Sequence, residues 1–404
     1  MKMKRVLAAL ACGMLLASAP AGAQQQGLRA TVTAPIEIVR AAEVAEIPLE
    51  VRVGKVFLHA AVNGQARQFI FDTGSPTMLS RQFAETLGLE IVGRNTGRDA
   101  HGAEVTMDVA VVDAITLGDV TFRRVPVLVF DFSDLPLGPC FIDGGILGSE
   151  IFAGSAWRID LERNVLAVAG SAAAFNIDEN AINARLYDFG YPHAPIVDYQ
   201  LGAIVDKALF DTGSAANVAL FRPVFDAVRD ELPSIETGRG SEGESAGGRG
   251  AVVDLFRFDV DGLILGDRSL GQVRGTARAV PPTLLGAGLL ADYIVTLDYP
   301  GERLWLEPRR TPAPRRGEAG YGLGFNGSRA EVVQMFEGSA AAAAGLRLGD
   351  HVIEAQGRSL EVSDSNPRCE AALWLAESFD ARAEAELVIE RGGVRQTLRI
   401  PAAP

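Results

Sequence analysis

Short alternations of apolar and polar residues fill most of the sequence and predict a chain built mainly of strands. Such alternation occurs in residues 49–53, and other strand-like apolar stretches cover 56–62 and 109–117. A period of two places every second side chain on the same face of a sheet. Helical patterns are few and short, at residues 81–87 and 223–232. The pattern therefore predicts small β-barrel-like units.

This strand pattern is written twice. Three segments of the first half correspond to three segments of the second half, at a nearly constant offset along the chain. The corresponding pairs are FIFDTGS (69–75) and LFDTGS (209–214), GILG (145–148) and TLLG (283–286), and IDLERNVLAV (159–168) and LDYPGERLWL (297–306). Matched blocks at one offset indicate a duplication, and two copies predict a pair of lobes.

An Asp-Thr-Gly turn after a strand gives each copy one acidic side chain in a defined place. If the copies face each other, Asp72 and Asp211 meet. Two carboxyl groups in contact share one proton over a range of pH, because ionising both is costly. Such a pair acts as acid and as base on a bound water. The residues expected to support it are Thr73, Gly74 and Ser75 in the first copy and Thr212, Gly213 and Ser214 in the second.

The two motifs, FIFDTGSPTMLS and LFDTGSAANVAL, resemble the active sites of aspartic peptidases. The apolar-apolar-glycine blocks resemble the element that packs beneath each aspartate in that group. The match covers about residues 46–308 and looks like two retropepsin-like lobes fused in one chain, at 46–170 and 171–308. The resemblance implies that Asp72 and Asp211 are catalytic and that two glycine-rich loops, 93–104 and 238–250, are flaps over the substrate. The flap candidates are His101, Gly102 and Gly243. Residues 93–108 contain no tyrosine, unlike the flap of pepsin-like enzymes.

The composition changes after the second copy. A Pro/Arg-rich segment at 309–317 predicts an extended linker, and a third unit follows at 318–404. YGLGF at 321–325 and AGLRLGD at 344–350 resemble a PDZ domain, an α+β fold, with a helix at 367–378. The resemblance implies that a loop of Gly322, Leu323, Gly324 and Phe325 presents backbone N–H groups to the terminal carboxylate of a peptide, which adds to the sheet as a strand.

The first residues predict export. Lys2, Lys4 and Arg5 precede an apolar run, and a small-residue pattern ends at Ala23. This is typical of a cleaved signal peptide at 1–23 and of a periplasmic or secreted protein. The alternative is an uncleaved anchor, which the shortness of the apolar run disfavours. Residues 24–45 are then a leader or linker, and no stable membrane span is expected after cleavage.

Charge and cysteine content narrow the remaining classes. The formal net charge of −13 argues against nucleic-acid binding, which uses Lys/Arg-rich surfaces. Cys140 and Cys369 lie in different predicted domains, so we expect two free thiols, although an exported protein can pair them. The four histidines are isolated and match no metal-ligand spacing, so no metal or organic cofactor is expected.

Two functions fit the sequence. The first is an exported aspartic endopeptidase that acts on peptide or protein substrates and also binds peptide C-termini through the PDZ-like unit. The second is a non-catalytic adaptor in which the same lobes grip extended peptides and the C-terminal unit adds valency.

Overall fold

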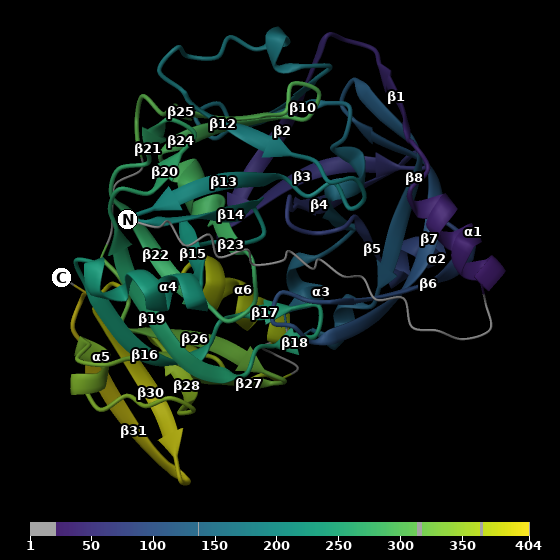
Figure 1. Ribbon diagram of the computed structural model, residues 1–404. Coiled ribbons are helices and arrows are strands. Elements are labelled where there is room, and N and C mark those ends of the chain that lie inside the picture. The colour runs from purple at the N-terminus through teal and green to yellow at the C-terminus, as the bar shows by residue number, and fades with distance from the viewer. Residues whose placement is uncertain (1–21, 136, 313–316, 364–366, 404) are drawn as a thin grey trace. The chain divides into compact units, whose positions relative to one another are not determined.

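The chain forms two compact units in a computed structural model that describes residues 22–135, 137–312, 317–363 and 367–403 (Figure 1). The units do not follow the chain in order, because two internal segments belong to the unit of the C-terminal residues. Unit 1 contains the described residues up to 131, residues 142–233 and residues 259–312. Unit 2 contains 132–141, 234–258 and the described residues from 317 onward.

The first half of unit 1 is mainly β. Its strands are β1 (Glu37–Arg40), β2 (Val44–Arg52), β3 (Lys55–Val62), β4 (Gln65–Phe71), β5 (Met78–Ser80), β6 (Ile91–Arg98), β7 (Glu104–Leu117), β8 (Val120–Phe130), β9 (Gly145–Leu147), β10 (Ala156–Asp160) and β11 (Val165–Ala169). The helices are α1 (Gly22–Val32) and α2 (Arg81–Thr86). An aromatic cluster of Phe71, Phe122, Phe152 and Trp157 fills the core beneath β4.

The second half of unit 1 repeats this use of short strands. It contains β12 (Ile182–Tyr187), β13 (Ile196–Leu201), β14 (Ile204–Asp211), β15 (Val218–Phe221), β20 (Ile264–Leu265), β21 (Arg268–Ser269), β22 (Val273–Arg278), β23 (Thr283–Gly286), β24 (Tyr293–Asp298) and β25 (Arg303–Pro308), with helix α4 (Arg222–Val228). The two halves are joined through β10, which pairs with β24 in an antiparallel register that places Trp157 opposite Leu297.

Unit 2 combines a sheet with short helices. Its elements are α3 (Gly138–Phe141), β16 (Ile235–Ser241), β17 (Glu244–Ser245), β18 (Gly248–Arg249), β19 (Val252–Val260, to its residue 258), β26 (Tyr321–Asn326), β27 (Arg329–Phe336), α5 (Ala340–Ala343), β28 (His351–Ala355), β29 (Arg358–Ser359), α6 (Arg368–Glu377), β30 (Ala385–Arg391) and β31 (Val394–Ile400). Phe325 and Leu387 lie in its core with Ala371 of α6.

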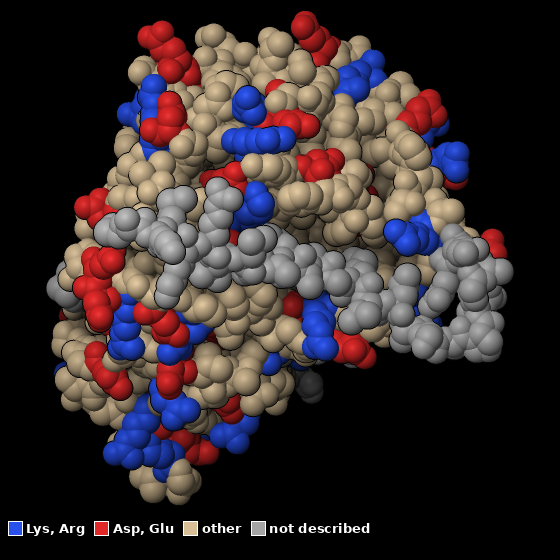
Figure 2. Space-filling view, viewed as in Figure 1, with Lys and Arg blue, Asp and Glu red and all other residues tan. Residues whose placement is uncertain are grey.

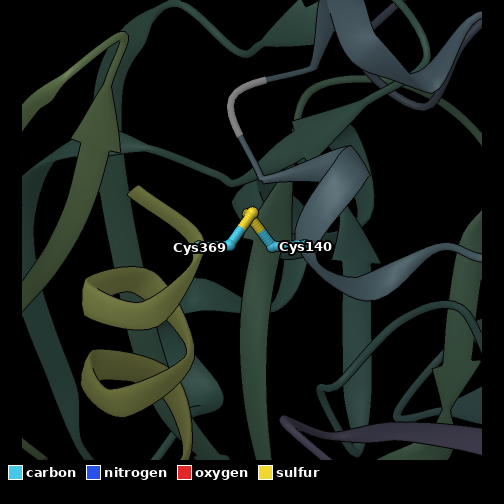
Figure 3. The surroundings of a disulfide bond; sticks show 2 residues. All are labelled: Cys140 and Cys369. Atoms are coloured by element: carbon cyan, nitrogen blue, oxygen red, sulfur yellow. A yellow bond between two sulfur atoms is a disulfide. The ribbon is translucent and has the colours of Figure 1, made fainter. Parts of the chain in front are cut away.

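A disulfide joins Cys140 of α3 to Cys369 of α6, with 5.0 Å between the Cα atoms (Figure 3). The prediction of two free thiols was therefore wrong. It assumed that residues 132–141 stay with the first lobe, whereas they belong to unit 2. Leu137 and Cys140 pack against the core of that unit, and this burial brings the two sulfur atoms within bonding distance.

Local predictions agree with the structure where the pattern is strong. Helices occur at 81–86, 222–228 and 368–377, close to the predicted stretches. The glycine-rich segment 238–250 is not one continuous loop, since it contains the end of β16 and the small hairpin of β17 and β18. Part of the predicted leader is ordered, because β1 pairs with β8.

The predicted signal peptide falls almost wholly outside the described residues. Within the described ranges, no helix is long and apolar enough to span a membrane. On the face drawn in Figure 2, basic and acidic side chains are interspersed, so that face carries no continuous basic surface.

Candidate active site

Asp72 and Asp211 each follow or end a strand of unit 1, and each strand is held by the apolar-apolar-glycine block of its own half. β4 pairs in parallel with β9, and the backbone N–H of Asp72 donates to the carbonyl of Leu147 at 2.9 Å. β14 pairs in parallel with β23, which places Asp211 opposite Gly286. These parallel pairings fix the height at which each carboxyl group leaves its strand.

The two turns are locked together by their threonines, which are fully buried. The Thr73 hydroxyl donates to the carbonyl of Phe210 at 2.6 Å, and the Thr212 hydroxyl donates to the carbonyl of Phe71 at 2.8 Å. Each hydroxyl also accepts the backbone N–H of the opposite threonine at 3.0 Å. This symmetric set of four hydrogen bonds explains why both copies carry threonine, since only a short hydroxyl reaches the opposite backbone.

The same arrangement brings the two carboxyl groups together. A side-chain hydrogen bond joins Asp72 and Asp211. Each carboxylate also accepts the N–H of the glycine in its own turn: Gly74 to Asp72 at 3.0 Å and Gly213 to Asp211 at 2.8 Å. A Cβ atom on either glycine would collide with the carboxyl group of the opposite aspartate. Both positions therefore require glycine for close approach rather than for an unusual φ.

Burial raises the pKa of Asp72 to about 7, and the neighbouring charge of Asp211 raises it further, whereas Lys55 lowers it. The direction is the one expected for two acids in contact, where ionisation of both is unfavourable. The pair therefore holds one proton over a range of pH in which one carboxyl group is charged and the other is neutral.

Lys55, at the start of β3, was not among the residues expected from the sequence. Its ammonium group donates to the carbonyl of Gly213, so a cation from the first half is fixed to the turn of the second half beside the acidic pair. Nothing in the local sequence distinguishes Lys55 from an ordinary surface lysine, because the contact joins residues far apart in the chain.

Glu150 is the second residue that sequence reasoning missed. Its side chain is 4% exposed and accepts the backbone N–H of Thr77, in the segment that follows the first Asp-Thr-Gly turn. Burial raises the pKa of Glu150 to about 7. A hydrogen bond from the Tyr191 side chain also reaches it. The position of Glu150, two residues after Gly148, is the one signal in the sequence that pointed to it.

The apolar-glycine blocks contact the turns directly. Gly148 donates its N–H to the Thr77 hydroxyl at 3.1 Å, and a Cβ there would meet the carbonyl of Ser75. Ala287 donates its N–H to the carbonyl of Ser214 at 2.7 Å. These contacts agree with the packing role expected for the two blocks.

The expected role of the two serines differs from what is observed. The Ser75 hydroxyl donates to the carbonyl of Pro76 at 3.0 Å, away from the carboxylate of Asp72. In the part of the chain that the structure describes, neither Ser75 nor Ser214 uses its hydroxyl to hold an aspartate carboxylate. That orientation comes from backbone N–H groups instead.

The flap candidates lie on two hairpins. His101 and Gly102 are at the turn between β6 and β7 in unit 1, where Asp99 accepts the N–H groups of His101 and Ala103 at 3.0 and 2.8 Å. Gly243 lies between β16 and β17 in unit 2. The structure thus places the two candidate flaps in different units.

The predicted carboxylate loop is a strand. Gly322, Leu323, Gly324 and Phe325 all belong to β26, which pairs with β27 and shifts register between Gly322 and Leu323. A register shift leaves local backbone groups outside the regular ladder. Helix α6, which was expected beside this segment, packs against β26.

No cluster of three or more metal-ligating side chains occurs among the residues that the structure describes. The donors in the candidate site are two acids, one lysine and backbone N–H groups. Such a set suits proton transfer to and from water.

Comparison with known proteins is consistent with this site. Residues 58–151 match the aspartyl protease family model. The matched segment contains Asp72 and the GILG block but ends before Asp211. No curated protein matches the chain. A solved structure that matches is an aspartic proteinase from Irpex lacteus, at 11% identity and a TM-score of 0.43, covering 66% of this chain and 98% of that one. The family match and the mainly β fold support an aspartic peptidase.

Proposed function

We propose that this chain is an exported aspartic endopeptidase in which Asp72 and Asp211 activate a water molecule for direct attack on a peptide bond. The observation that carries the proposal is the hydrogen-bonded pair of carboxyl groups, held by the interlocked threonines and by backbone N–H donors. The proposal includes a duplicated origin of the two halves of unit 1, because each delivers its aspartate from the same arrangement of strands.

The chemistry requires one proton on the pair. The charged carboxylate removes a proton from water as the water oxygen bonds to the carbonyl carbon of the substrate. The neutral carboxyl donates its proton to the carbonyl oxygen, which gives a tetrahedral diol. The C–N bond then breaks as the nitrogen receives a proton and the diol returns one to the pair. General acid and base assistance of this kind contributes about 10²–10⁴-fold in rate.

Two further features support export and peptide recognition. A disulfide such as Cys140–Cys369 persists in an oxidising compartment and is rare in the cytosol. The C-terminal residues of unit 2 carry a glycine-containing strand beside a helix, an arrangement suited to adding an extended peptide at a sheet edge. We therefore include a PDZ-like peptide-binding role for unit 2 in the proposal.

Digestion of a mixed peptide library, with the cut sites mapped by mass spectrometry, tests the function. We expect internal cleavage by the wild type and its loss in both Asp72→Asn and Asp211→Asn. The control is Asp113→Asn, which changes an exposed aspartate on β7 and should cleave normally. Absence of cleavage by the wild type from strongly acid to neutral pH would refute the peptidase and favour the peptide-binding adaptor.

A further inference from the structure

The hairpin that carries the second candidate flap is built into the sheet of unit 2. β16 pairs with β27 in an antiparallel register that places Gly238 opposite Phe336 and Gly240 opposite Gln334 (Figure 1). A Cβ atom on Gly238 would lie 2.6 Å from the carbonyl oxygen of Met335, so this close pairing requires glycine. The chain leaves unit 1 after residue 233 and re-enters it at 259, and the segment between is held by unit 2.

Side chains reinforce the pairing of β16 with β27. The Thr237 hydroxyl donates to the Glu337 carboxylate at 2.6 Å, and the Glu337 N–H donates to the carbonyl of Thr237 at 2.9 Å. The Gln334 amide donates to the carbonyl of Ser241 at 2.7 Å. The base of the hairpin is therefore anchored on both sides of the backbone pairing.

The returning strand β19 adds a second anchor. The Arg257 guanidinium lies 3.6 Å from the centre of the Phe336 ring and donates to the carbonyl of Ala319 at 2.6 Å. A cation over an aromatic face gains electrostatic attraction, and the bond to a backbone carbonyl fixes its direction. Both strands of the hairpin are thus tied to the start of β26 and the end of β27.

The tip of the hairpin reaches the strand proposed to bind peptides. Arg249 of β18 donates to the backbone carbonyl of Phe325 and forms an ion pair with Glu244 at 3.0 Å. A Cβ atom on Gly324 would lie 3.3 Å from the Arg249 guanidinium, so the approach depends on a small residue there. Arg249 therefore rests directly on the backbone of β26.

The register of β26 shows which edge Arg249 occupies. Asn326 and Arg329 close the two-residue turn to β27, so they form a hydrogen-bonded pair, and the next pair, Phe325 with Ala330, points its backbone groups away from the partner strand. The Phe325 carbonyl therefore faces the outer edge of β26. Among the described strands, only β27 pairs with β26. Arg249 takes an acceptor that an added peptide strand would use.

We propose that an extended peptide binding along the outer edge of β26 competes with Arg249 for the Phe325 carbonyl, and that its binding releases residues 242–250 and thereby increases hydrolysis. The binding half stands on the contacts within unit 2. The effect on hydrolysis rests on the proposed function, in which 238–250 is the second flap. Removing a charge-assisted donor from the edge should tighten peptide binding about tenfold, equivalent to about 1.4 kcal/mol.

The binding half is tested with fluorescein-labelled hexapeptides that have a free C-terminus and a randomised apolar last position. Fluorescence anisotropy is measured on the full chain carrying Asp72→Asn, so that the probes are not cleaved. We expect Arg249→Ala to bind about tenfold tighter, and Arg249→Lys to stay near the parent affinity. The matched control is Arg239→Ala, which removes an arginine of the same hairpin whose ion-pair partner, Asp254, is also in that hairpin. Equal affinity of the Arg249→Ala and parent chains, or no binding to either, overturns the proposal.

The regulatory half is tested by hydrogen exchange and hydrolysis. Backbone amides of residues 242–250 should exchange faster in Arg249→Ala, and also in the parent chain when probe is added. In the chain with both aspartates intact, Arg249→Ala should raise kcat/KM several-fold without added peptide. If the probes bind as expected but neither exchange nor hydrolysis changes, the regulatory half is wrong. If no variant hydrolyses any peptide while the anisotropy shift occurs, the proposed function fails and the edge competition stands.

Discussion

Replacing Thr73 with valine should strongly destabilise unit 1, because it removes one hydroxyl and keeps the shape of the side chain. The Thr73 hydroxyl satisfies two backbone groups of the opposite turn, the Phe210 carbonyl and the Thr212 N–H. Both groups lie in a fully buried setting, where water cannot replace the lost partner. The perturbation therefore isolates the polar part of the interlock.

The expected cost follows from those two stranded groups. A buried backbone donor or acceptor left without a partner costs about 1–3 kcal/mol, so Thr73→Val should lower the free energy of unfolding by about 2–6 kcal/mol. Thr73→Ser keeps the hydroxyl and loses one methyl group, which costs about 1 kcal/mol. The difference between the two variants measures the hydrogen bonds themselves.

Denaturant unfolding followed by tryptophan fluorescence provides the assay. Trp157 and Trp305 lie in unit 1 and Trp374 in unit 2, so a Trp374→Phe background makes the signal report unit 1 alone. If Thr73→Val cost no more than Thr73→Ser, the interlock would not hold the aspartates in place and the reasoning would be refuted.

Three further predictions concern charge and the disulfide. Lys55→Met should move the pH–activity profile about one unit toward higher pH, because Lys55 lowers the pKa of Asp72, whereas Lys55→Arg should not move it; an unmoved profile in Lys55→Met contradicts this. The folded-state pKa of Glu150, about 7, lies above its ordinary 4.5, so Glu150 stabilises the fold at low pH and this contribution, about 3 kcal/mol, is lost as pH rises from about 4.5 to about 7. Glu150→Gln should remove that part of the pH dependence in denaturant titrations, and identical curves for both proteins would rule it out. Cys369→Ser should destabilise unit 2 by up to about 5 kcal/mol and speed hydrogen exchange in α6, and two alkylatable thiols in the unreduced wild type would show that the bridge is not formed.

Several parts of this architecture follow from local sequence. Residues 81–87 and 367–378 predict helices that the structure contains, since amphipathic spacing and end signals lie within one short window. The two Asp-Thr-Gly motifs and their glycine blocks also predict which acids come together, because a matched offset carries information about pairing between halves of the chain.

The glycine-rich segment 238–250 shows the limit of such reasoning. Glycine and polar residues predict a loop when the sequence is read alone. In the fold, Gly238 and Gly240 lie in a strand because the absence of a side chain lets β16 approach the backbone of β27. The same composition thus has two structural meanings, and only the neighbouring strand decides between them.

What the sequence by itself determined was the positions of the acidic motifs and the mainly β class, since strand period, turn residues and repeats are local or periodic signals. Only the tertiary structure decided the partners of Lys55, Glu150, Cys140 and Arg249. Each of these residues contacts a partner more than 70 positions away in the chain, apart from local pairs such as that of Arg249 with Glu244. No periodic pattern records such contacts, because they arise from the packing of whole elements within each unit.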